Sequence, residues 1–187
     1  MKSYPSIFND CLSPVTPGPS SSNTAGPYRL GAMASDLLVG KPVHLHGEMS
    51  KKGGYFATFY GMHSDKAFLL GIMKKDLRSY NFNNIYADAD AHGLSYTYEF
   101  SDNVPNRPSE SAWLTLSSEV GDTIFVKTAS LGGGEIYIDE LDGIKTYIDG
   151  KYFYLLVRVA ANFLPSIKNM LPGTYSVADS SSGESLI

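Results

Sequence analysis

Hydrophobic residues recur at three- and four-residue spacing between residues 27 and 39. The apolar positions in this stretch are Leu30, Met33, Ala34, Leu37 and Leu38. Such a stripe is typical of a helix that packs against a core. Pro27 suits the first turn of a helix, and Gly40 followed by Pro42 suits its end. The pattern therefore predicts a helix over residues 27–39.

Residues 43–49 alternate between apolar and polar side chains, which is the period of a strand with one wet face. The apolar positions are Val43, Leu45, Gly47 and Met49, and the polar positions are His44, His46 and Glu48. A second helix is predicted over residues 64–75, with Ser64 as its N-cap and Asp65 in its first turn. Lysines in its last turn would suit the helix dipole.

Further strands are predicted where aromatic or β-branched residues alternate with polar ones. These stretches are residues 95–102, 123–130 and 135–143, whereas residues 102–111 carry two prolines and are typical of a loop. Glycines at positions 132–134 separate two of these strands. They indicate a bulge, a tight turn or a close backbone approach.

A nearly continuous apolar run over residues 152–159, YFYLLVRV, predicts one more strand, in the centre of the sheet. Residues 172–187 are rich in Ser and Gly and are expected to fray. Helices mixed with hairpin-like strands predict an α+β fold with a mixed, largely antiparallel sheet and flanking helices. We expect one domain over residues 1–160 and a short, partly disordered C-terminal segment over residues 161–187.

The composition suits one globular core, since 43% of the 187 residues are hydrophobic. The net charge is −4 and no basic run exceeds two residues, so we expect no nucleic-acid partner. We also expect no membrane partner, because no apolar stretch approaches ~20 residues. The N-terminus lacks the apolar core of a signal peptide, which predicts a cytoplasmic protein. Cys11 is the single cysteine and cannot hold an iron–sulfur cluster or structural zinc alone.

A run of small polar residues, GPSSSNTAG, occupies residues 18–26, directly before the first predicted helix. Backbone amides at a helix N-terminus lack intrahelical partners and attract anions. The residues that would add donors there are Ser20, Ser21, Ser22, Asn23 and Thr24. A carboxylate would fit this site. The alternatives are a linker, or one Asn or Thr acting as an N-cap beside solvated serines.

Three other groups could carry chemistry. His63 and Asp65 precede or open the second helix, where a histidine could transfer protons, although a surface or capping role is the alternative. His44 and His46 share one strand face, but two ligands are weak evidence for a metal, and we expect no metal site. Asn106 lies on a loop between prolines, which positions binding residues or simply turns the chain.

Four stretches, in order, resemble motifs of one family. They are the serine run with the residues before it, GMHSDKA from Gly61, VPN from Val104 and SLGGG from Ser130. The chain is similar to the β chain, or N-terminal β domain, of the iron–sulfur-dependent L-serine dehydratases, also called L-serine ammonia-lyases. The resemblance covers roughly residues 3–145.

The resemblance implies a fold similar to the allosteric substrate-binding domain of phosphoglycerate dehydrogenase. It also implies a partner α chain that holds a 4Fe-4S cluster, and conversion of L-serine to pyruvate and ammonia by the pair. The serine run would hold the carboxylate of this small amino-acid substrate, and Asp65 and Asn106 would also bind it. On this interpretation the chain is a lyase subunit that is inactive alone, and a dimer is one arrangement that the resemblance allows.

The chain also departs from the family pattern. Asn23, Met62 and Val104 stand where the family has histidines, which leaves His63 as the candidate for proton transfer. Binding could survive where the original chemistry does not. The alternative hypothesis is therefore a non-catalytic amino-acid-binding or regulatory module.

Overall fold

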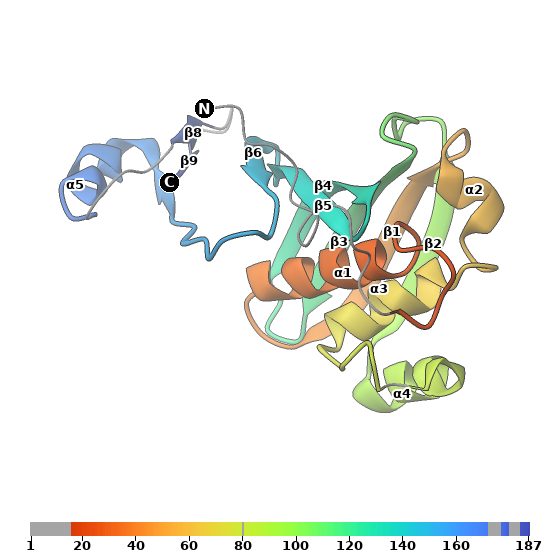
Figure 1. Cartoon of the computed structure of the whole chain (residues 1–187). Helices are drawn as coiled ribbons and strands as arrows, with labels where there is room; N and C mark the ends of the chain where they lie inside the picture. Colours follow the sequence, from red (N-terminus) through yellow and green to blue (C-terminus); the bar gives the residue numbers. More distant parts are fainter. Residues whose placement is uncertain (1–15, 80, 172–176, 180–183) are drawn as a thin grey trace.

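The computed structural model describes residues 16–79, 81–171, 177–179 and 184–187. Its main feature is a six-stranded sheet with the order β2-β1-β3-β4-β5-β6 (Figure 1). The strands are β1 (Pro42–Ser50), β2 (Ser95–Ser101), β3 (Glu110–Ser118), β4 (Thr123–Gly132), β5 (Glu135–Leu141) and β6 (Ile144–Ile148). Strands β1 and β2 are parallel, and the other neighbours are antiparallel. The predicted α+β fold with a mixed, largely antiparallel sheet is confirmed.

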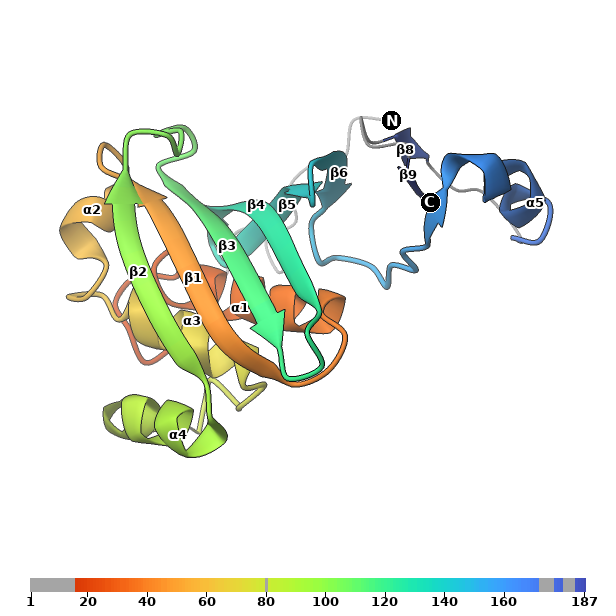
Figure 2. The same cartoon turned by 180° about the vertical axis from the view of Figure 1, so that it is seen from behind.

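Two helices pack side by side on one face of this sheet, and they are α1 (Ala25–Leu37) and α3 (Ser64–Ile72) (Figure 1). Shorter helices are α2 (Gly54–Thr58), η2 (Phe82–Asn84) and α4 (Ile85–His92). Viewed from behind, strands β2, β1, β3 and β4 lie in front, and no helix of the described residues covers this second face (Figure 2). None of the described helices is long and apolar enough to cross a membrane.

Two glycines allow α1 and α3 to approach closely. A Cβ at Gly31 would lie 2.5 Å from the carbonyl oxygen of Phe68, and a Cβ at Gly71 would lie 2.0 Å from that of Tyr28. Both distances are shorter than any real Cβ contact, so the backbones meet where side chains would otherwise hold them apart. Helix α1 therefore packs closely against a neighbouring helix as well as against the sheet.

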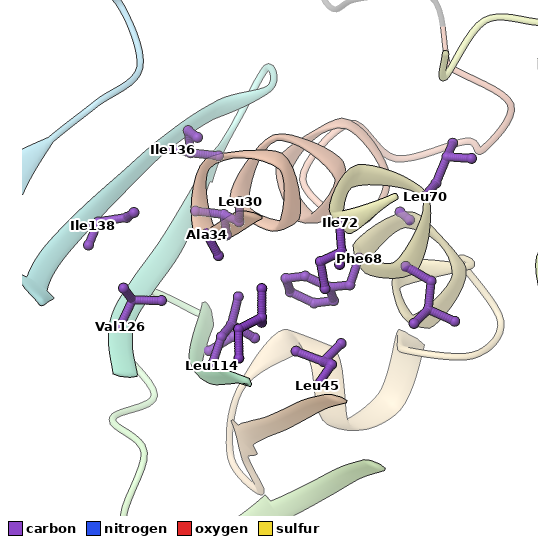
Figure 3. Packing of buried hydrophobic residues seen from close by; sticks show 14 of the residues in the cluster. Leu30, Ala34, Leu45, Phe68, Leu70, Ile72, Leu114, Val126, Ile136 and Ile138 are labelled. Carbon is purple, nitrogen blue, oxygen red and sulfur yellow. The ribbon is translucent and has the colours of Figure 1, made fainter. Parts of the chain in front are cut away.

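The core lies between this helix pair and the sheet. Leu30 and Ala34 of α1 and Phe68 and Ile72 of α3 are essentially inaccessible to solvent. They point toward sheet residues that include Leu45, Leu114, Val126 and Ile138 (Figure 3). Strand β1 alternates as predicted, because Leu45, Gly47 and Met49 are buried whereas His46 and Glu48 on the other side are partly exposed.

The predicted start of α3 is wrong by one position. Ser64 is the first helical residue, and His63 occupies the N-cap with a left-handed backbone (φ 63°, ψ 29°). The hydroxyl of Ser64 donates instead to the carbonyl oxygen of Asn23 at 2.8 Å, so a long-range contact takes the place of local capping. The helix ends at Ile72, before Lys74 and Lys75, and so has no lysine in its last turn.

The predicted central strand over residues 152–159 is also wrong. Tyr152, Phe153 and Leu155 are exposed and lie outside both sheets. The chain leaves the main sheet after β6 and forms β7 (Arg158–Ala160), which joins β8 (Ala178–Asp179) and β9 (Glu184–Leu186) in a small sheet of order β7-β9-β8. A continuous apolar run has no polar face to orient it, so its pattern could not distinguish a buried strand from this exposed connection.

Two short helices, η3 (Ala161–Phe163) and α5 (Leu164–Lys168), follow β7. The predicted fraying of residues 172–187 falls partly outside the described residues, whereas the described end holds β8, β9 and the buried Leu186 and Ile187. The division into residues 1–160 and 161–187 stays a prediction. Of the glycines at 132–134, Gly133 and Gly134 form the tight turn between β4 and β5, and Gly132 ends β4 beside a register shift. All three have positive φ.

Candidate functional site

The serine run forms a compact turn that leads directly into α1. The helix is confirmed, but it begins at Ala25 and ends at Leu37, two residues earlier at each end than predicted. The amide of Asn23 donates to the carbonyl oxygen of Ser20 at 3.3 Å, and the amide of Gly26 donates to that of Ser21 at 2.9 Å. These bonds hold the run in one conformation. The run is therefore an ordered loop of the domain, and the linker interpretation is wrong.

Asn23 is the centre of this loop and is only 6% exposed. Its side-chain amide nitrogen donates to the hydroxyls of Ser20 and Ser22 at 3.1 and 3.3 Å. Its side-chain oxygen accepts from the hydroxyls of Thr58 at 2.8 Å and Ser64 at 3.3 Å. Because both ends of the amide are engaged, Asn23 ties the serine run to α2 and α3.

Thr24 occupies the N-cap position of α1, but its side chain makes no capping bond. Its hydroxyl donates to the carbonyl oxygen of Met62 at 3.4 Å, and the residue is fully buried. Neither Asn23 nor Thr24 caps α1 with its side chain, so the alternative of a simple N-cap beside solvated serines is not what the chain forms. Both residues instead connect the serine run to the stretch that precedes α3.

Two serine hydroxyls of the loop, those of Ser20 and Ser22, are candidate donors to a ligand. The amide of Gly26 is already bonded, and Pro27 has no N–H, so the helix N-terminus offers fewer free amides than expected. The Ser20 and Ser22 hydroxyls both accept from Asn23 and lie 3.1 Å apart. Their mutual bond uses one hydroxyl proton, which leaves the other free to donate to a ligand. Both serines are partly exposed, and such an arrangement suits an anion.

Asp65 lies one residue beyond Ser64 and is 2% exposed. The Tyr86 hydroxyl donates to its carboxylate oxygen Oδ2, whereas Oδ1 is buried and has no hydrogen-bond partner among the described residues. Burial raises the pKa of Asp65 above its ordinary value, and the bond from Tyr86 opposes this shift. Burial likewise raises the pKa of Tyr86, and Asp65 adds to that shift. A buried carboxyl with a raised pKa can hold or release a proton closer to neutrality.

His63, the candidate for proton transfer, directly precedes α3. Its Nδ1 atom is buried without a partner among the described residues, and its ring lies 6.0 Å from that of Phe82. The next residue, Ser64, binds Asn23, so His63 lies next to a direct contact of the serine run. Its catalytic role stays a prediction.

Ser130, from the SLGGG stretch, lies against the start of α1. A Cβ at Gly26 would be only 2.1 Å from the Ser130 hydroxyl oxygen. This hydroxyl is fully buried and has no hydrogen-bond partner within the described part of the chain. Three of the four sequence stretches that suggested the family therefore meet at the N-terminus of α1.

Asn106 is not brought to the same place by any contact of the described residues. It is exposed on the loop between β2 and β3, where Val104 is buried. The loop is linked to α2, because the amide of Gly54 donates to the carbonyl oxygen of Ser109 at 2.8 Å. The role of Asn106 in substrate binding stays a prediction.

Four residues of this site were missed as candidates. Ser64 and Ser130 occur within the quoted motifs but were not recognised as functional. Thr58 binds Asn23, and the Tyr55 hydroxyl donates to the carbonyl oxygen of Ser22 at 3.5 Å. Nothing in the local pattern around Tyr55 and Thr58 marks them, because their partners lie more than 30 positions away.

The residues present do not fit an iron–sulfur cluster. Such clusters are held by several cysteine thiolates, and Cys11, the one cysteine of the chain, lies outside the described residues. The hydroxyls that surround the Asn23 amide are poor ligands for iron–sulfur chemistry. The site on this chain therefore suits a polar organic ligand.

Comparison with known proteins identifies relatives over most of the chain, although no family model matches it. The "Probable L-serine dehydratase, beta chain" of Bacillus subtilis (strain 168) is 33% identical over 154 residues, which is 82% of this chain and 68% of that protein. The "L-serine dehydratase, beta chain" of Peptoniphilus asaccharolyticus is 26% identical over 149 residues, 80% of this chain and 66% of that protein. With its α+β fold and clustered motifs, the chain belongs to the family of L-serine dehydratase β chains.

Proposed function

We propose that this chain is the β subunit of an L-serine ammonia-lyase and that its serine run binds the carboxylate of the substrate. The observation that carries the proposal is the convergence of three distant stretches at the N-terminus of α1. Asn23 meets Ser64, and Gly26 meets Ser130. The names of the two relatives support the subunit role.

In this proposal the substrate carboxylate replaces the mutual bond between Ser20 and Ser22, so that both hydroxyls donate to it. Asn23 acts as a positioning residue, since its amide nitrogen occupies an acceptor site on each serine and so orients their protons. Because the Asn23 amide has no titratable proton near neutrality, proton transfer falls to another group. Asp65 and His63 are the candidates, because each is next in the chain to Ser64, which binds Asn23.

A partner α chain completes the proposed enzyme. It would supply the cysteines for a 4Fe-4S cluster, which this chain cannot provide. The overall reaction removes water from L-serine, and the resulting aminoacrylate is hydrolysed to pyruvate and ammonia. A cytoplasmic location and a dimer remain part of the proposal.

A second candidate function is a binding or regulatory module without catalysis. The observation that favours it is the complete engagement of Asn23 at the position where the family has a histidine. A loop built in this way can bind a carboxylate but cannot exchange a proton through residue 23. Both candidates share the binding step, so they differ only in turnover.

Calorimetry with L-serine tests the binding step. The Ser20→Ala/Ser22→Ala variant loses charge-assisted hydrogen bonds, each of which contributes about 1.5–3 kcal/mol, so affinity should fall roughly tenfold or more. Ser117→Ala is the control, because Ser117 lies on β3 and binds Thr123. Equal affinity in the double variant and the wild type would remove the serine run from the site.

Turnover separates the two candidates. The chain would be produced anaerobically with a cysteine-bearing α chain, and pyruvate release from L-serine measured on a complex with a loaded cluster. Pyruvate formation supports the lyase. Binding of L-serine without pyruvate formation would favour the regulatory module.

A further inference from the structure

The uncovered face of the sheet, opposite α1 and α3, carries a group of metal-ligating side chains (Figure 2). Residues of β1 alternate, so that Leu45 and Met49 point toward the helices while His46 and Glu48 point away. Strand β2 runs parallel to β1 and places Glu99 directly opposite Glu48. The ligand atoms of His46, Glu48 and Glu99 all lie within 4.8 Å of one another.

We propose that His46, Glu48 and Glu99 form a binding site for a divalent first-row transition metal ion such as Zn²⁺. One imidazole nitrogen and two carboxylates are a ligand set that suits such an ion. His46 Nε2 lies 3.3 Å from Glu99 Oε1, which is close to the ~3.3 Å separation of two ligands bound to one tetrahedral Zn²⁺. Glutamate side chains on an exposed face can rotate to close the remaining distance.

Neighbouring side chains already orient two of the three ligands. His46 Nδ1 lies 2.9 Å from the Thr97 hydroxyl oxygen, and when Nδ1 donates that bond, Nε2 carries the lone pair that a metal needs. The Ser101 hydroxyl donates to Glu48 Oε1, which leaves the second carboxylate oxygen for a metal. These contacts match the outer hydrogen bonds that usually support metal ligands.

The charge arrangement also favours a cation. Like charges directly opposite each other on neighbouring strands are destabilising, and Glu48 and Glu99 form such a pair. Among the described residues no lysine or arginine forms an ion pair with either carboxylate, and the nearby Lys51 and Lys52 pair with Asp102. A bound metal ion would remove this repulsion and join β2, the edge strand of the described sheet, to β1.

His44 provides a matched control for the proposal. It lies on the same face of β1, two residues earlier, and its Nδ1 lies 2.8 Å from the Ser95 hydroxyl oxygen. It is not among the residues whose ligand atoms converge. From two histidines on one strand we expected no metal site. The pairing of β1 with β2 adds Glu99 as a third ligand, and the proposed site is therefore one that the sequence alone did not suggest.

The test uses the full chain, freed of metal by a chelator, with Zn²⁺ as the probe in calorimetry and thermal unfolding. We expect one ion per chain, a rise in Tm with Zn²⁺, and little competition from Mg²⁺, which prefers oxygen ligands. His46→Ala and Glu99→Gln should each weaken binding at least tenfold and lose the rise in Tm. His44→Ala should keep both.

Glu99 is well exposed, so Glu99→Gln also serves if His46→Ala fails to fold. The proposal is overturned if wild-type protein binds no Zn²⁺ at millimolar concentration. It is equally overturned if folded Glu99→Gln binds as tightly as the wild type, which would place the ion elsewhere. Neither outcome bears on L-serine binding, because the serine run lies at the N-terminus of α1 on the other face of the sheet.

Discussion

The hydroxyl oxygen of Thr58 lies 2.8 Å from the side-chain oxygen of Asn23. This contact joins the end of α2 to the serine run, and the Ser64 hydroxyl adds a bond from α3 to the backbone carbonyl oxygen of Asn23. Asn23 thereby fixes the position of Ser20 and Ser22 relative to two helices. The buried Asn23 thus anchors the loop to α2 and α3, while Ser20 and Ser22 remain partly exposed to solvent.

Replacing Asn23 with alanine should destabilise the protein. The change leaves buried donors and acceptors without partners, which costs about 1–3 kcal/mol in the free energy of unfolding. Urea denaturation monitored by fluorescence measures this loss. The exposed Asn83→Ala variant is the control and should change stability by less than about 0.5 kcal/mol.

A double-mutant cycle isolates the Asn23–Thr58 contact. If the two side chains interact directly, the losses of Asn23→Ala and Thr58→Val should not add, with a coupling of about 0.5–3 kcal/mol. Additive losses would mean that the 2.8 Å contact contributes nothing by itself.

Gly71→Ala should force α1 and α3 apart. The new methyl group would lie 2.0 Å from the carbonyl oxygen of Tyr28 and 2.9 Å from the amide nitrogen of Ala32, and backbone atoms cannot rotate away. We expect a loss of about 1–3 kcal/mol or more. Gly61→Ala is the control, since its nearest neighbour, the Thr58 carbonyl oxygen, is 3.9 Å away. Thermal unfolding that does not distinguish the two variants would contradict the close helix contact.

Phe59→Ala should open a cavity in an aromatic cluster. Phe59 is 1% exposed, and its ring lies 4.9 Å from that of Tyr98 and 5.8 Å from that of Tyr55. Truncating a buried aromatic side chain costs about 3–5 kcal/mol. Phe56→Ala, three positions earlier and 57% exposed, should cost far less. Similar midpoints for both variants in urea would show that Phe59 does not belong to the core.

Asp65 should make stability depend on pH in an unusual direction. Because burial raises its pKa above the ordinary 3.8, the folded state binds this proton more tightly than the unfolded state. The stabilisation from the protonated group is present at low pH and is lost as pH rises through the window between the two values. Asp65→Asn keeps a neutral acceptor for Tyr86 and should not show this loss.

The measurement compares urea midpoints of the wild type and Asp65→Asn between about pH 4 and pH 7. The wild type should fall relative to the variant as pH increases. Tyr86→Phe should steepen the wild-type trend, because it removes a hydrogen bond that lowers the pKa of Asp65. Parallel profiles for the wild type and Asp65→Asn would rule out a raised pKa.

Local pattern was sufficient for the elements around the site. The spacing of Leu30 and Ala34 predicted α1, and the alternation through Leu45 and Met49 predicted β1, because one face of each element is buried. The apolar run at residues 152–159 gave a wrong prediction. A fully buried strand and an exposed connection can both have a continuous apolar sequence, so the pattern does not separate them. The short helices α2 and α4 have too few residues for a clear period.

The candidate site likewise has one part that the local sequence predicted and another that depends on long-range contacts. A run of serines ahead of a helix is visible within ten residues of sequence, and so is its suitability for an anion. The bonds from Thr58 and Ser64 to Asn23, and the contact of Ser130 with Gly26, join positions far apart in the chain. They arise only because the start of α1 and the loop before it pack against α2, α3 and β4. Periodicity acts between near neighbours along the chain, whereas these contacts depend on which elements the buried core brings together.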